Sequence, residues 1–141
     1  MPDSRLIRHS KHLLESILTA LALFYAVSLV AQHAHGSTSP KYDAQTETKM
    51  KGTVDDVKIP SSATEIVYLL MKTGTDTSIE VYVCPKSFLD DMGVTFAKGD
   101  QIALTGSKIK QGDADLILAR EIVKGTDTIV LRDDKGKPVW N

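Results

Sequence analysis

The side chains that most often perform catalysis or bind metal ions are unevenly spread along this chain. All four histidines, His9, His12, His33 and His35, lie near the start of the 141 residues, and Cys84 is the only cysteine. A Ser-His-Asp or Cys-His nucleophile therefore cannot be built after His35. A single cysteine also excludes an intramolecular disulfide, a cysteine-rich zinc finger and an iron–sulfur centre.

The paired carboxylates lie in predicted turns, at a helix end or at a predicted strand bulge. Catalysis by paired carboxylates requires burial and raised pKa values, whereas turn aspartates are ordinarily solvated. One of the pairs, on a tight turn, also offers too few oxygens for a Ca²⁺ site. We therefore expect a protein that is not an enzyme and has no catalytic residues. The pairs are Asp55-Asp56, Asp90-Asp91, Asp113 with Asp115 (the tight turn), and Asp133-Asp134.

A metal site could form only near the N-terminus. His33 and His35 would lie beside a free amine if an export signal were cleaved after Ala31, and an amine with imidazoles can bind Cu(II) or Ni(II). The favoured interpretation places both histidines in a linker at a cleavage site. No metal site and no cofactor are therefore predicted.

Cys84 stands at the predicted end of a strand, directly before Pro85 and Lys86. A helix start and a nearby cation would make this thiol reactive. The favoured alternative is that Cys84 is a small, half-buried filler.

The first 36 residues form a separate segment of the sequence. Arg5, Arg8 and Lys11 precede an apolar run at 17–31, and the small residues Ala34 and Gly36 follow it. A run of this length fits the core of an export signal better than a membrane-spanning helix. We expect a periplasmic or secreted protein. The alternative is an uncleaved anchor at 13–31 that attaches the chain to the inner membrane.

The remaining residues are slightly acidic. Residues 37–141 hold 14 basic and 16 acidic side chains, a net charge of −2. A protein that neutralises many phosphates would carry the opposite sign, so the charge disfavours a nucleic-acid partner. A membrane contact is expected only through the N-terminal segment, if that segment is not cleaved.

The rest of the chain is predicted to form short strands separated by Gly and Asp turns. Alternating apolar residues predict an interior that contains Met50, Val54, Val57, Ile59, Ile79, Val81, Val83, Ile102 and Leu104. A phase shift at Asp55-Asp56 and a glycine at Gly106 predict strand bulges. The strands are predicted at 48–59, 65–72, 78–84, 101–109 and 115–123, with a helix at 85–93 and a terminal hairpin at 128–132 and 137–140.

Five strands with a short helix between the third and the fourth are typical of the OB-fold, an all-β Greek-key barrel. Phe88, Leu89 and Met92 on the helix would plug one end of this barrel. The predicted organisation is an N-terminal signal or anchor helix at 1–36, a linker at 37–45, and an OB-fold domain at 46–141 that ends in a β-hairpin.

Two sequence stretches resemble known OB-fold families. Lys51-Gly52-Thr53-Val54 and the Lys98-Gly99-Asp100 turn resemble the periplasmic stress-tolerance OB-fold family, which implies a stress-related role in the envelope. Residues 108–122 are more weakly similar to a hairpin of the OB-fold haem chaperone of cytochrome c maturation. That family attaches haem through a histidine where this chain has Thr126, so haem attachment is not expected.

The candidate ligand-binding residues are those expected on the outward face of the second and third strands, together with nearby cations. OB-folds usually bind on this face. The protein is expected to be a non-enzymatic binding module of the cell envelope, with a small ligand, an oligosaccharide or a protein as partner. The alternatives are a single-strand nucleic-acid-binding protein, or a structural subunit with Trp140 as its partner surface. The candidates are Tyr68, Lys72, Tyr82, Lys108, Arg120 and Arg132.

Overall fold

The computed structural model describes residues 39–74 and 76–141, and within these residues it has six β-strands and one short α-helix. These residues belong to one unit, Ser39–Asn141. A 3-10 turn, η2 (Ala44–Thr46), leads into the first strand. The other elements are β1 (Glu47–Lys58), β2 (Ile66–Thr73), β3 (Thr77–Pro85), α2 (Lys86–Asp91), β4 (Gln101–Gln111), β5 (Ala114–Lys124) and β6 (Asp127–Val130).

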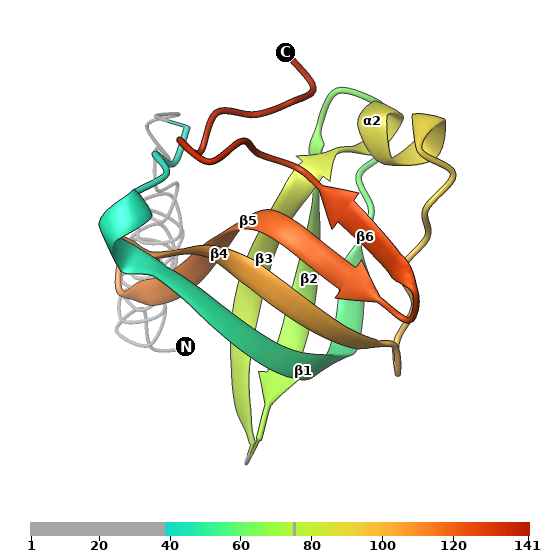
Figure 1. Cartoon of the computed structure of the whole chain (residues 1–141). Helices are drawn as coiled ribbons and strands as arrows, with labels where there is room; N and C mark the ends of the chain where they lie inside the picture. Colours follow the sequence, from blue (N-terminus) through green and yellow to red (C-terminus); the bar gives the residue numbers. More distant parts are fainter. Residues whose placement is uncertain (1–38, 75) are drawn as a thin grey trace, which may run out of the picture. The chain divides into compact units, whose positions relative to one another are not determined.

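The first five strands close into a barrel (Figure 1). The sheet runs in the order β3-β2-β1-β4-β5-β6, and a parallel pairing of β3 with β5 joins its two sides. Closure hides most of the strand edges that would otherwise expose unpaired backbone groups. The predicted fold class, an all-β five-stranded barrel with a short helix between its third and fourth strands, is confirmed.

Strand β1 belongs to both sides of the barrel because it bends. Its first half pairs with β4, and its second half pairs with β2. The register shifts between Val54 and Asp56, where a bulge was predicted. A second predicted bulge is present between Thr105 and Gly106. A Cβ on Gly106 would collide with the carbonyl oxygen of Leu118, so only glycine lets β5 approach this closely.

The interior is one apolar cluster, and alternate residues of the strands contribute their side chains to it. The predicted members Val54, Ile79, Val81, Val83, Ile102 and Leu104 are all buried in it. Ile59 was predicted to point inward, and this is wrong, since its side chain is 61% exposed. Strand β1 ends at Lys58 and Pro60 follows, so the inward alternation stops before Ile59.

Helix α2 covers one end of the barrel, as predicted (Figure 1). Leu89 is buried in the core, and Phe88 and Met92 pack against it. Gly93 has a φ of +67°, which ends the helix in the left-handed conformation that favours glycine.

The predicted C-terminal hairpin at 128–132 and 137–140 forms only in part. An antiparallel bridge joins Arg132 to Pro138, and the backbone N–H groups of Asp133 and Val139 donate to the carbonyl oxygens of Lys137 and Leu131. Residues 127–130 instead form β6, which pairs antiparallel with β5 across a turn at Gly125. Beyond this short pairing, Trp140 packs on Phe88, with ring centroids 5.9 Å apart. The predicted turn is present, and Asp133 accepts backbone hydrogen bonds from Lys135 and Lys137.

The predicted signal or anchor at 1–36, with all four histidines, lies outside the described residues. Among residues 39–74 and 76–141, no helix has the length and apolar character needed to cross a membrane. The same residues contain no group of His, Cys, Asp and Glu side chains that could hold a metal ion.

Candidate functional site

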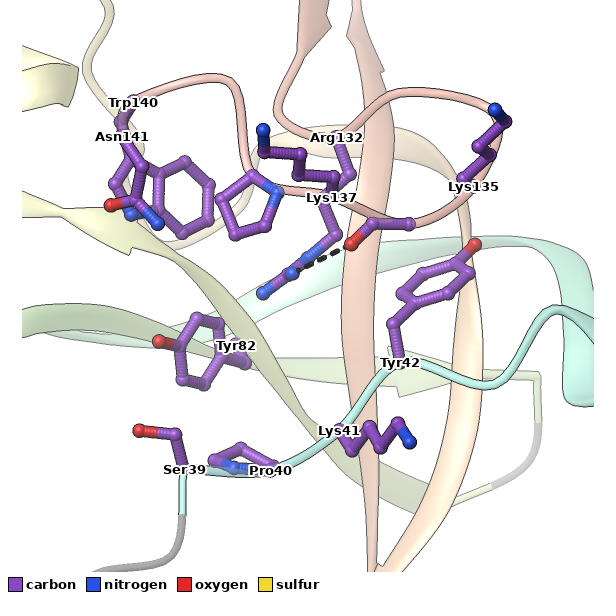
Figure 2. A pocket seen from close by; sticks show the side chains of 12 residues that line it. Ser39, Pro40, Lys41, Tyr42, Tyr82, Arg132, Lys135, Lys137, Trp140 and Asn141 are labelled. Carbon is purple, nitrogen blue, oxygen red and sulfur yellow. Dashed lines mark hydrogen bonds between the residues drawn. The ribbon is translucent and has the colours of Figure 1, made fainter.

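A pocket of about 480 Å³ lies where the two ends of the described chain meet (Figure 2). Residues 39–42, which precede η2 and are called the arm below, form one wall. Residues 132–141, called the tail below, form the opposite wall, and Tyr82 of β3 forms the floor. This volume is within the range of small-molecule sites, about 300–1,000 Å³.

Arg132 is the central side chain of this pocket. It is only 5% exposed, and its guanidinium carbon lies 5.8, 5.5 and 5.1 Å from the ring centroids of Tyr42, Tyr82 and Trp140. Its Nη1 donates a hydrogen bond to the carbonyl oxygen of Gly136 at 3.1 Å. Three aromatic rings therefore surround a cation at distances where cation–π attraction operates.

No carboxylate neutralises Arg132 within the described part of the chain. Ion pairs join eight other Lys and Arg side chains to Asp or Glu, and Arg132 is absent from them. Its Nε is buried and has no hydrogen-bond partner among these residues. Burial lowers the pKa of Arg132 below its usual value, and the two tyrosines partly offset this. A buried cation with unused donors is costly unless something else satisfies it.

Three lysines add positive charge at the rim of the pocket. Lys41, Lys135 and Lys137 line it, and none of its lining residues is Asp or Glu. Figure 2 shows their ammonium groups directed away from the Arg132 guanidinium, which points into the pocket. The pocket lining thus holds four basic and no acidic side chains, although residues 37–141 carry a net charge of −2.

A hydrogen-bonded cluster holds the arm against the barrel. The Tyr42 hydroxyl donates to Glu47 Oε2 at 2.6 Å, and Arg120 makes two hydrogen bonds to the same carboxylate. Burial and the bond to Glu47 raise the pKa of Tyr42 to about 12. The bonds from Tyr42 and Arg120 hold the pKa of Glu47 below its usual value. This cluster fixes the position of the Tyr42 ring, and hence of one pocket wall.

Two of the predicted ligand-binding residues, Tyr82 and Arg132, line the pocket, as does the predicted partner residue Trp140. Tyr68 does not line it but meets Tyr82 edge to face, with centroids 5.4 Å apart. Trp140 also packs against Phe88 and the core, as expected of a side chain that caps the barrel.

The other predicted cations are engaged elsewhere. Lys72 pairs with Asp55 at 3.1 Å, and Lys108 pairs with Asp115 at 3.3 Å. Arg120 is bound to Glu47 in the cluster described above. The structure therefore does not bring these three side chains together as one ligand surface.

Cys84 is fully buried in the apolar core, and burial raises the pKa of its thiol to about 12. A thiol at this pKa is almost entirely protonated near neutral pH and is a poor nucleophile. The structure thus favours the filler interpretation of Cys84, although the side chain is fully buried and not half-buried as predicted.

The sequence did not indicate the arm as part of a site. Residues 37–45 were expected to be a linker, yet Tyr42 contacts Arg132, and the backbone N–H of Asp43 donates to Ser107 of β4. The one available signal was Tyr42 itself, an aromatic residue in an otherwise polar stretch. No spacing rule links it to residues of the tail.

Comparison with known families assigns the barrel region of the chain to a family. Residues 46–129 match the model of the MamS/MamX magnetosome protein family. The chain belongs to this family. This family is different from the two OB-fold families that the sequence resembles, and the match tests neither of those resemblances. No curated protein matches the chain.

The match to the MamS/MamX family covers β1 to β6 and stops short of most of the pocket. Tyr82 lies inside the matched region, whereas the arm, Arg132 and the rest of the tail lie outside it. Apart from Tyr82, the pocket is therefore built by the segments that flank the matched barrel in this chain.

Proposed function

We propose that this MamS/MamX family member is an exported, non-enzymatic binding module of the cell envelope that holds an anionic ligand in the Arg132 pocket. The proposal of export is based on the basic and apolar pattern of residues 1–36. The barrel acts as the rigid support, and the arm and the tail supply the binding walls.

The observation that carries this proposal is the state of Arg132. A guanidinium has five N–H donors in a fixed fork that suits carboxylate and phosphate groups. One donor is used by Gly136, and Nε is unpaired among the described residues. An anion in the pocket would neutralise the cation and accept from the Nη donors at the tip of the guanidinium, since Nε itself is buried.

Binding without chemical conversion is the better supported role. No histidine follows His35, and Cys84 is buried with a raised thiol pKa. The Asp and Glu side chains near the pocket serve structural roles, since Glu47 fixes the arm and Asp133 caps the tail turn. A positive, aromatic-walled pocket without a base or nucleophile suits recognition.

The alternative of a nucleic-acid partner has less support. Such a partner needs several free cations along one groove and exposed stacking rings. Lys72 and Lys108 are each paired with a carboxylate, and the Tyr68 and Tyr82 rings contact each other edge to face.

The experiment uses Trp140, the only tryptophan of the chain, as a reporter inside the pocket. The full chain is titrated with benzoate, phenyl phosphate and neutral benzyl alcohol while its emission is followed. We expect at least one anion to give a saturable change that benzyl alcohol does not give. The change should be lost in Arg132→Met and kept in Lys108→Met. A response to benzyl alcohol equal to that of both anions would contradict the proposal.

A further inference from the structure

We propose that the group bound by Arg132 is a phosphate carried on an apolar body, either a soluble phosphate ester or a phospholipid headgroup. This rests on the proposed function, because it names the class of anion that the Arg132 pocket takes.

The charge of the pocket favours an anion with more than one negative charge. Arg132, Lys41, Lys135 and Lys137 contribute four positive side chains, and the lining includes no Asp or Glu. The attraction to each cation grows in proportion to the ligand charge. A phosphomonoester carries about −1.5 to −2 near neutral pH, whereas a carboxylate carries −1.

The polar groups of the pocket come from several directions. Arg132 reaches in from the tail, Ser39 belongs to the arm and Tyr82 belongs to β3. Figure 2 shows the Ser39 and Tyr82 hydroxyls on the side toward which the guanidinium points. A planar carboxylate presents only two oxygens in one plane. A tetrahedral phosphate presents oxygens to the guanidinium fork and to the hydroxyls at the same time.

The remaining walls of the pocket are apolar, and an inorganic ion would not cover them. Pro40 and Pro138 line the pocket beside the rings of Tyr82 and Trp140. Phosphate alone would leave these surfaces in water, whereas an attached aromatic or alkyl body would cover them. The pocket volume, about 480 Å³, has room for both parts.

The first test compares four compounds by calorimetry on the full chain. Phenyl phosphate is expected to bind at least about tenfold more tightly than benzoate and than inorganic phosphate, and benzyl alcohol is expected not to bind. Benzoate binding as tightly as phenyl phosphate would overturn the phosphate assignment while leaving the proposed function intact. Binding of neither organic anion would overturn both.

Variants test whether Arg132 is the anchor. Arg132→Met is expected to weaken phenyl phosphate binding by at least about tenfold, because a charge-assisted bidentate contact is lost. The double variant Lys135→Gln/Lys137→Gln is expected to weaken it by about two- to fivefold and to reduce its salt dependence. Lys108→Met removes a cation outside the pocket and is expected to change nothing. Unchanged affinity in Arg132→Met would contradict the proposal.

A folding failure of Arg132→Met would be recognised by exposure of the Cys84 thiol to an alkylating reagent. In that case Arg132→Lys replaces it, since this variant keeps the charge and loses only the planar fork. It is expected to retain protection of Cys84 and to bind phenyl phosphate at least about threefold more weakly. Binding equal to that of the unchanged protein would contradict the proposal.

The second test distinguishes the two sources of the phosphate. The full chain is mixed with phosphatidylcholine vesicles, with and without phosphatidic acid. Extra binding to phosphatidic acid that Arg132→Met abolishes assigns the site to a lipid headgroup. Arg132-dependent binding of phenyl phosphate without that extra vesicle binding assigns it to a soluble ester. Arg132-dependent binding in neither assay would overturn the proposal.

Discussion

The Tyr42 ring fills the space where a Cβ on Gly136 would stand. This contact joins the arm to the tail, and it lets both segments close around Arg132 (Figure 2). Gly136 also has a φ of +79°, which L-amino acids with side chains rarely adopt. The pocket therefore depends on a glycine that lies far from Tyr42 in the sequence.

Gly136→Ala is expected to displace the Tyr42 ring and to disturb the wall of the pocket that Tyr42 forms. Gly125→Ala is a matched control, because Gly125 has a similar φ of +61° but no atom lies within 4 Å of the position that its Cβ would take. Both variants carry the cost of positive φ, about 1 kcal/mol. The free energy of unfolding in urea should fall by about 1–3 kcal/mol more in Gly136→Ala than in Gly125→Ala, because the added methyl group overpacks against the Tyr42 ring. Equal losses in the two variants would show that the contact with Tyr42 is unimportant.

Arg132→Met is expected to keep or raise the free energy of unfolding while it removes anion binding. A buried charge without a carboxylate partner is costly, and replacement of buried ions by apolar side chains is often neutral or stabilising. The lost cation–π contacts offset part of this gain. The measurement is a urea titration without ligand. A loss of more than about 2 kcal/mol would mean that Arg132 serves mainly as a structural cap.

Glu47→Gln is expected to lower the free energy of unfolding by about 1 kcal/mol near neutral pH, because it removes the charge that Tyr42 and Arg120 bind. The pKa of Glu47 is lowered in the folded state. Its contribution is therefore complete above the unfolded value of 4.5 and is lost as the pH falls through the folded value. The stability difference between the two proteins should shrink in acid.

Glu121→Gln is the control for this experiment, since Glu121 forms no ion pair in the described residues. It should change the free energy of unfolding little near neutral pH. A Glu47→Gln difference that stays constant into strong acid would refute the assigned role of the carboxylate.

Cys84 should resist alkylation in the native protein and react only on unfolding. Its side chain is fully buried, and its thiol pKa is raised to about 12. The reaction rate should rise with urea in parallel with loss of the barrel. Rapid modification without denaturant would contradict the position of Cys84 in the core.

Much of the barrel could be predicted because its signals are local. Alternation placed Val81, Val83 and Leu104 in the core, and a one-residue phase shift located the bulge at Asp55-Asp56. Strand alternation reports burial only while the strand continues, and this is why Ile59 was misplaced. The terminal hairpin is shorter than predicted, because residues 127–130 pair with β5 and only residues 131–133 pair with residues 137–139.

Most of the pocket could not be predicted, because its contacts join distant segments. Arg132 meets aromatic rings from the arm, from β3 and from the tail. The predicted cations Lys72 and Lys108 look equivalent to Arg132 in the sequence. Only the fold shows that each of the two has a carboxylate beside it and that Arg132 has none among the described residues.

The most direct test of an anion site at Arg132 is the arginine Nε–Hε region of an NMR spectrum of the ¹⁵N-labelled full chain. The chain has four arginines, and Arg132→Lys assigns the signal of interest. Addition of phenyl phosphate is predicted to shift the Arg132 signal saturably and to leave that of Arg120, which is bound to Glu47, in place. An Arg132 signal that does not move while phenyl phosphate binds would contradict the account.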